Sequence, residues 1–263
     1  MPGYEAPVAG TGPPMLRLPV STRATRPVVS ALAVTLGGTF YVVGKLRRRR
    51  RKPLHPDGAV LPGTLQRDGA PTAWGAPWLD ATGEHPAVVR LSRSAGLPQP
   101  LPDVLGLAVQ VCLDGQNADL LMSSAGPGRV GRFLLRPRFS HGRGIYTTLL
   151  PYRSPRGPVF LAAEPQPPRQ LPTDLIAMAT QLSAEPMRFV LSCAAPGGAW
   201  ERFGSLEVGS PTLPAPRSDG SVDAQIAFDP VLHPLPGLQL PDWLARIRAT
   251  TYAAARRARG LPD

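Results

Sequence analysis

Cysteine is rare in this 263-residue chain, and neither of its two cysteines belongs to a C-x-x-C pair or a Cys/His ligand pattern. Cys112 and Cys193 both lie in apolar, strand-like runs, where thiols are usually small buried apolar groups. We therefore expect neither a zinc site nor a disulfide, and a reducing, cytoplasmic compartment fits. With only four histidines in the chain, a multi-histidine metal site is also disfavoured.

Aromatic residues make up 6% of the chain and acidic residues are outnumbered, 18 against 29 Lys and Arg, for a net charge of +11. A basic surface attracts phosphate, anionic lipid or carboxylate groups without choosing among them. The shortage of aromatics and of recognition motifs argues against nucleic-acid binding. The sequence also lacks a glycine-rich phosphate loop, an H-E-x-x-H motif and a G-x-S-x-G motif, which excludes several common enzyme classes.

The composition divides the chain into three parts. Residues 1–27 are rich in Pro, Gly and Ala without periodicity and are predicted to be a disordered tail. Residues 28–51 combine the apolar run VVSALAVTLGGTFYVVGKL (28–46) with a polybasic stretch. The run is short for a bilayer span, so a membrane anchor and a packing arm both remain open. Basic residues after an anchor would keep the main domain, 52–263, in the cytoplasm.

Short apolar segments separated by Pro and Gly clusters predict a mainly β domain of the α+β class. An antiparallel barrel or sandwich fits their spacing. A helix is predicted over 174–183, and a second from Asp242 to Gly260. The predicted strands are 87–92, 106–113, 118–122, 144–152, GPVFLAA (157–163), 187–194 and 204–209.

Three polar residues near predicted strands could carry chemistry. His55 precedes a strand, and a histidine titrates near neutral pH, so it could act as an acid and base. Arg90 and Ser92 share one face of a strand, where an arginine would need an anion and a serine could fix the tautomer of a histidine. A turn histidine in an exposed loop and a solvated edge strand remain the alternatives at this point.

The last predicted helix places Arg248 one turn before Tyr252, so both side chains share a face, and Arg259 follows seven residues later. A guanidinium beside a phenol favours the phenolate, because opposite charges stabilise the ionised form. A phenolate is a hard ligand for ferric iron. A solvated surface pair is the alternative interpretation.

These stretches occur together, in order, in a known family. LHPDGAVLPGTL resembles the V-H-A-x-G-x-x-x-x-G-x-F segment of the haem catalase superfamily, and VVRLSRSAG resembles its V-R-F-S strand. DVLGLAVQV resembles D-x-R-G-F-A-V-K-F, and ADLLMSS resembles W-D-L-V-G-N-N. The C-terminal FDPVLHPLPGLQLPDWLARIRATTYAAARRARG is similar to the family's F-x-P…V-P-G-I…R-x-F-x-Y…R-L-G segment.

The resemblance implies a catalase-like antiparallel β-barrel with a C-terminal haem-contacting helix, holding haem b through its iron. It implies His55 as the distal histidine, Ser92 as the serine that supports it, and Tyr252 as the axial metal ligand. The further haem-binding positions are Arg248, bonded to the tyrosine oxygen, and the propionate-facing Lys52, Arg90 and Arg259.

The chain also departs from the family pattern. The distal asparagine falls at Ser123, or at Ser124 if the loop shifts, and a hydroxyl reaches less far than an amide. The residues after the axial tyrosine are A-A-A, and the family's wrapping segment and helical domain have no counterpart, which describes a minimal catalase-related protein. Phe133 is a hypothesis for the aromatic residue that stacks on haem.

The resemblance implies a haem-dependent peroxidase or weak catalase acting on hydrogen peroxide or organic hydroperoxides. Two alternatives are a lipid-hydroperoxide-rearranging haem enzyme similar to allene oxide synthase, and a non-catalytic membrane-surface protein. The expected partners are a peroxide and, through residues 28–46 and the basic run, an anionic membrane surface. A homo-oligomer is also considered.

Overall fold

The computed structural model describes residues 57–94, 97, 100–209 and 228–241. All lie within the predicted domain 52–263. The predicted tail, the 28–51 segment and the C-terminal helix lie outside the described residues.

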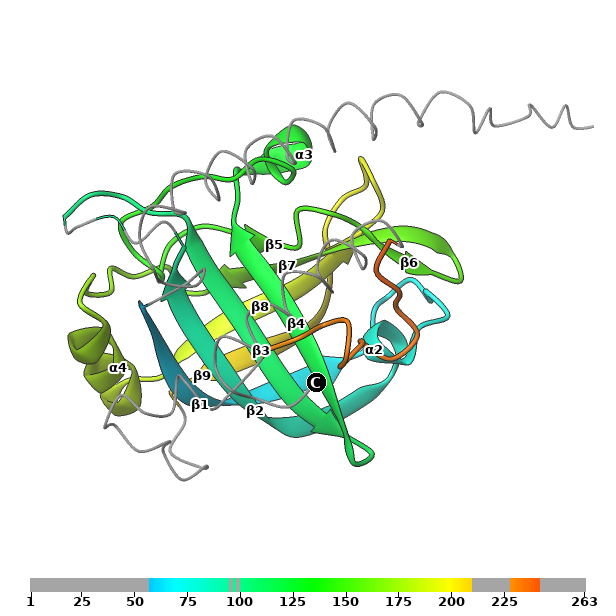
Figure 1. Ribbon diagram of the computed structural model, residues 1–263. Coiled ribbons are helices and arrows are strands. Elements are labelled where there is room, and N and C mark those ends of the chain that lie inside the picture. The colour runs from blue at the N-terminus through cyan, green and yellow to red at the C-terminus, as the bar shows by residue number, and fades with distance from the viewer. Residues whose placement is uncertain (1–56, 95–96, 98–99, 210–227, 242–263) are drawn as a thin grey trace, which may run out of the picture. The chain divides into compact units, whose positions relative to one another are not determined.

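Nine antiparallel strands form the described fold (Figure 1). Eight of them close into a ring in the order β5-β4-β3-β2-β1-β9-β8-β7, because β5 pairs with β7 as well as with β4, while β6 adds to β7. The strands are β1 (Asp57–Asp68), β2 (Thr82–Arg93), β3 (Leu105–Leu113), β4 (Gln116–Ser124), β5 (Tyr146–Thr147), β6 (Tyr152–Ser154), β7 (Gly157–Pro165), β8 (Met187–Ala194) and β9 (Glu201–Val208).

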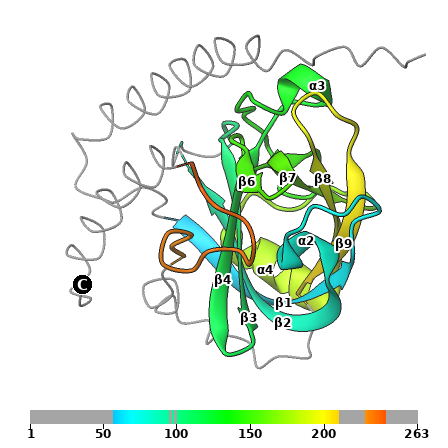
Figure 2. The same ribbon diagram turned by 90° about the vertical axis from the view of Figure 1, so that its right-hand side faces the viewer.

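Alternation of side chains along each strand creates the core. On β2, Ala87, Val89 and Leu91 point inward and are at most 1% exposed, while Val88 and Arg90 on the opposite face are half-buried. Since side chains alternate between the two faces of a sheet, every strand of the ring has one core face and one outer face. Figures 1 and 2 show β1–β4 forming one wall of the barrel and β7–β9 the facing wall.

Local sequence signals define the connections. Asp114 and Gly115 both have positive φ, 50° and 79°, which is the geometry that a two-residue hairpin turn between β3 and β4 requires. Helix α2 (Pro77–Asp80) buries Trp78 and Leu79 in the core. Helix α3 (Gly128–Gly131) follows β4. Helix α4 (Leu175–Ala184) begins after Asp174, whose carboxylate accepts a hydrogen bond from the Ala177 N–H, and packs against β1.

Two sequence predictions need correction. The single strand predicted over 144–152 is two short strands, β5 and β6, because Leu149 has φ 58° and Pro151 has no N–H to donate. Cys193 is buried as predicted, but Cys112 is exposed, since it lies on the outer face of β3 opposite Asn117; both thiols are free.

Candidate functional site on the outer face of the barrel

Four small residues form a row across the outer face of strands β1–β4. Gly58 lies opposite Ser92, Ser92 opposite Gly106, and Gly106 opposite Ser123. Directly opposed residues in antiparallel strands project from the same face, so Ser92 and Ser123 share a face with only a glycine between them. The structure therefore brings together two of the three residues predicted to be catalytic. The third, His55, lies outside the described residues.

Arg90 crosses this small-residue row at Gly58. Arg90 pairs with Val60 on β1 and Ala108 on β3. These residues form the neighbouring row on the same face, two residues along each strand from Gly58, Ser92 and Gly106. A Cβ atom added at Gly58 would lie 2.5 Å from Cζ and 2.6 Å from Nη2 of Arg90, so the guanidinium group lies directly over the glycine. Only glycine leaves room for this arrangement, which places a cation at the edge of the small-residue row.

The register also distinguishes Ser123 from Ser124. The Ser124 hydroxyl donates to the Arg136 carbonyl oxygen at 2.7 Å and accepts from the Leu105 N–H at 3.0 Å, and the residue is fully buried. This hydroxyl is committed to holding the backbone. Ser123, on the opposite face, is half-buried and shares its face with Ser92. Of the two serines, only Ser123 shares a face with Ser92, and its role stays a prediction.

Phe133 lies in the loop after α3 and packs edge-to-face against Phe160, with ring centroids 4.9 Å apart. The carbonyl oxygen of its neighbour Arg132 accepts a hydrogen bond from Thr147 Oγ1 at 2.8 Å. Thr147 is in turn the register partner of Ser123. Phe133 therefore follows a residue, Arg132, that is bonded to the strand next to Ser123.

The remaining predicted cofactor positions are not described. Lys52, Arg248, Tyr252 and Arg259 lie outside the described residues, and their roles stay predictions. Among the described residues, no group of three or more His, Cys, Asp or Glu side chains could hold a metal ion.

Sequence reasoning missed a buried carboxylate on the same strand as Ser123. Asp119 Oδ2 accepts hydrogen bonds from the Asp229 N–H at 2.6 Å and from His233 Nδ1 at 2.9 Å, while Oδ1 accepts from Gln110 Nε2 at 2.9 Å. The Asp119 N–H donates to the His233 carbonyl oxygen. These contacts fix residues 229–233 to β4, on the side away from β8 and β9 (Figure 2), while Pro236 and Gln239 are bonded to Trp78 and Arg153. An acid within the apolar run ADLLM was the available signal.

Two other buried polar clusters lie apart from the row, on the core side of the barrel. Arg67 donates to the Pro77 carbonyl oxygen at 3.0 Å, and its Nη2 lies 2.9 Å from His85 Nε2. Burial and the adjacent guanidinium lower the pKa of His85.

The second cluster contains His141 and Tyr146. Burial, with a smaller contribution from Arg93, lowers the pKa of His141 to about 3. Burial also raises the pKa of Tyr146, whose hydroxyl lies 3.1 Å from His141 Nδ1. His141 is therefore neutral at pH 7.

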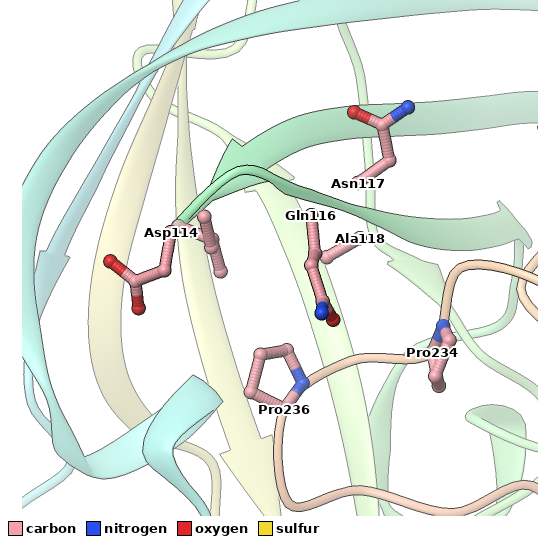
Figure 3. Close-up of a pocket in the computed structure, with 7 residues that line it drawn as sticks. Asp114, Gln116, Asn117, Ala118, Pro234 and Pro236 are labelled. Atoms are coloured by element: carbon pink, nitrogen blue, oxygen red, sulfur yellow. The ribbon is translucent and has the colours of Figure 1, made fainter.

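A cavity of about 300 Å³ opens at the β3–β4 turn, between Leu113, Gln116 and the prolines Pro234 and Pro236. In Figure 3 the Gln116 side chain extends from the hairpin toward the loop that carries these prolines. The cavity lies at the opposite end of β4 from Ser123 and contains none of the predicted site residues. We therefore do not assign the candidate site to it.

Comparison with known proteins gives a consistent result for the fold. No family model matches the chain, and no curated protein matches its sequence. Among solved structures, a bacterial catalase matches with a TM-score of 0.58 at 12% identity, over 84% of this chain and 60% of that one. A fungal catalase matches with a TM-score of 0.61 at 14% identity, over 100% and 67% of the two chains.

Catalase A from Saccharomyces cerevisiae matches with a TM-score of 0.58 at 12% identity, over 98% of this chain and 68% of that one. The chain spans only 60% of the length of the bacterial catalase, and identities this low carry information about the fold alone. The eight-stranded antiparallel barrel described above is therefore a catalase-like fold, which confirms the mainly β barrel that the sequence motifs predicted.

Proposed function

We propose that this protein is a haem-dependent peroxidase or weak catalase that acts on hydrogen peroxide or organic hydroperoxides. One observation carries the proposal: a catalase-like barrel presents the row Gly58, Ser92, Gly106 and Ser123 on one face, with the Arg90 guanidinium at its edge.

The described half of the site fits a flat, anionic macrocycle. Glycine and serine leave the row itself without bulky side chains, so in the proposal a planar group lies over it. A guanidinium offers paired donors for a carboxylate, as a haem propionate requires. In the proposal, Lys52 and Arg259 supply further positive charge, and Tyr252, kept as a phenolate by Arg248, is the iron ligand.

When bound, haem iron would supply the redox chemistry that breaks the peroxide O–O bond. His55 accepts the proton of the near peroxide oxygen and returns it to the far oxygen, so that water can leave. The Ser92 hydroxyl holds the His55 ring in one tautomer. Ser123 donates one hydrogen bond that orients the peroxide. A single hydroxyl donor orients a second peroxide less well than an amide would, so oxidation of organic reductants is favoured over release of oxygen.

The decisive experiment is an absorption spectrum of the purified full chain, supplemented with haem, beside the Tyr252→Phe and Tyr152→Phe variants. We expect high-spin ferric tyrosinate bands in the wild type and in Tyr152→Phe, which alters a buried tyrosine of β6. These bands should be absent from Tyr252→Phe. A wild-type protein with no Soret band would reject haem binding and favour the non-catalytic alternative.

Activity is tested on the same samples by dye oxidation and oxygen release. We expect dye oxidation to exceed oxygen release, and His55→Ala to lower dye oxidation by about 100-fold or more, since a positioned acid–base contributes 10²–10⁴-fold. A fatty-acid hydroperoxide consumed much faster than hydrogen peroxide would favour the lipid-hydroperoxide alternative. The enzyme proposal would be refuted if the protein showed no dye oxidation, no oxygen release and no consumption of the fatty-acid hydroperoxide.

The predicted cytoplasmic location and membrane association through residues 28–46 remain proposals, which cell fractionation of the full chain and of a chain with that segment made polar would test. Among the described residues, the structure contains no helix with the length and apolar character needed to cross a bilayer. Gel filtration of the purified protein would test the homo-oligomer.

A further inference from the structure

Exposed apolar side chains are concentrated in two loops. Of the seven exposed large apolar residues among the described ones, Leu97 and Leu101 lie between β2 and β3, and Val130, Leu134 and Phe139 lie between β4 and β5. Val130 is 73% exposed and Phe139 57%. Such a concentration marks an interaction surface more often than scattered single residues do.

Hydrogen bonds connect the β2–β3 loop to the β4–β5 loop, and a buried arginine contacts the β2–β3 loop. Asp103 and Arg138 exchange backbone hydrogen bonds of 3.0 and 2.8 Å, which connects the loop carrying Leu101 to the one carrying Phe139. Arg93, buried in the barrel, donates to the carbonyl oxygens of Leu97 and Leu101. Arg93 therefore contacts the backbone at both exposed leucines.

The same surface is basic. Arg129, Arg136 and Arg143 are exposed, and the sequence contains no Asp or Glu between Asp119 and Glu164. Within residues 127–143, two further arginines point into the structure. Arg132 donates to the Gly198 carbonyl oxygen and lies over the Trp200 ring, and Arg138 donates to the carbonyl oxygens of Ala125 and Arg143. The arginines thus divide into a supporting pair and an exposed trio.

We propose that this arginine–apolar rim, formed by the exposed side chains of residues 127–143 with Leu97 and Leu101, docks on an anionic lipid bilayer. Aliphatic and phenylalanine side chains enter the interfacial region of a bilayer, while arginines around them bind anionic headgroups. Docking through the rim would hold the barrel at the surface independently of residues 28–51 and of haem.

The charge and chemistry of the rim argue against other occupants. A second copy of this chain would bring its own +11 net charge and the same three arginines to the interface, and like charges across an interface are costly. Single-stranded nucleic acid is bound through stacking on aromatic rings, and four of the five apolar residues are aliphatic.

The proposal is tested by sedimentation of the full chain with vesicles of phosphatidylcholine alone or mixed with phosphatidylglycerol. The rim variant is Arg129→Gln, Arg136→Gln and Arg143→Gln together. The matched control, with the same change in net charge, alters the exposed Arg153, Arg188 and Arg202 on other strands. Each basic residue at an anionic surface contributes about 1 kcal/mol, so we expect roughly a 100-fold loss of partitioning in the rim variant. The control should lose less than about threefold, since charges far from the surface are screened.

A second variant separates insertion from electrostatic attraction. Val130→Cys in a Cys112→Ser background leaves one accessible thiol for an environment-sensitive fluorophore, because Cys193 is buried. Its emission should shift to the blue with vesicles containing phosphatidylglycerol and stay unchanged with phosphatidylcholine alone. These measurements do not depend on haem or on turnover, so they succeed or fail separately from the proposed enzyme activity.

Several outcomes would overturn the proposal. Equal losses in the rim and control variants would mean attraction by net charge alone. Unchanged binding of the rim variant would assign all membrane binding to residues 28–51. A fluorophore that stays in water, tighter binding of an oligonucleotide than of vesicles, or a dimer that dissociates only in the rim variant would each identify a different role for this surface.

Discussion

Gly58 and Gly63 lie five residues apart on β1, and an added methyl group would meet different obstacles at each. At Gly58 the Cβ would displace the end of the flexible Arg90 side chain. At Gly63 it would lie 2.6 Å from the backbone oxygen of Glu207 and 2.9 Å from a methyl group of Val89, neither of which can move aside easily. The first glycine therefore serves the candidate site, and the second serves the packing of the barrel.

We predict that the two alanine variants affect different properties, haem affinity in one and stability in the other. Gly58→Ala should change the free energy of unfolding by less than about 1 kcal/mol, and it should weaken haem binding by roughly tenfold through displacement of Arg90. Gly63→Ala should cost about 1–3 kcal/mol of stability through overpacking. Urea unfolding and haem titration of both variants measure these quantities. Equal haem affinity in Gly58→Ala and wild type would show that the Arg90 position is irrelevant to the cofactor.

His141 should make the stability of the protein depend on pH. Its Nε2 atom is buried and has no hydrogen-bond partner among the described residues, and burial lowers the pKa of the imidazole to about 3. In the unfolded chain a histidine has a pKa of about 6.5. Between these pH values the unfolded state binds one more proton than the folded state. The contribution of His141 to the free energy of unfolding is therefore fully present above about pH 6.5, and it decreases as the pH is lowered.

Between pH 7 and pH 5 this residue should therefore remove about 2 kcal/mol from the free energy of unfolding. His141→Gln, which does not titrate, should lose less stability than the wild type over the same interval, even if it is less stable at pH 7. Urea unfolding of both proteins at the two pH values provides the measurement. Identical pH dependence would show that the imidazole is charged or hydrated in the folded protein.

At the scale of elements, the contact between β4 and residues 228–241 depends on one carboxylate. Asp119 is fully buried and accepts hydrogen bonds from Gln110, Asp229 and His233. The contact joins this segment to the strand that carries Ser123, and the axial helix predicted after Pro241 lies outside the described residues.

Asp119→Asn should loosen residues 229–233, because an amide cannot accept at both ends as the carboxylate does. We expect a loss of about 3 kcal/mol in unfolding free energy and faster amide hydrogen exchange over 229–233. Exchange at 238–239 should change less, since Gln239 exchanges backbone hydrogen bonds with Arg153. Gln110→Ala, which removes one partner only, should cost about 1 kcal/mol. Mass-spectrometric hydrogen exchange checks both variants, and unchanged exchange over 229–233 in Asp119→Asn would show that other contacts hold these residues.

At the scale of the whole molecule, closure of the barrel is uneven. Strands β1 and β2 pair over twelve residues each, whereas β5, which completes the ring, pairs over two residues with β4 and two with β7. A closed barrel has no free edge along its ring, but its weakest pairing determines where it opens first. The β4–β5–β7 seam is the shortest pairing in the ring.

Native-state hydrogen exchange should therefore show lower protection at Tyr146 and Thr147 than at the central residues of β1 and β2. Sub-global opening at the seam should require less denaturant than exchange in β1. Equal protection on both sides of the barrel would indicate that the ring opens only through global unfolding. NMR or mass-spectrometric exchange in increasing urea distinguishes the two cases.

Much of the fold was predictable from local patterns. The strand MRFVLSCA has the predicted bounds, 187–194, and the helix after Asp174 follows its N-cap. These elements depend on the alternation of apolar residues and on capping, which involve neighbours in the chain. The order of the motifs predicted the catalase-like barrel.

Only the tertiary structure decided which residues of different strands share a face. Ser123 and Ser124 are adjacent in the sequence, and a shift of one residue in strand register would exchange their locations. The position of Arg90 over Gly58, the clamp between Asp119 and His233, and the connection of Leu101 to Phe139 all join residues that are distant in the chain. Such pairings are set by long-range strand register, which a local sequence pattern does not encode.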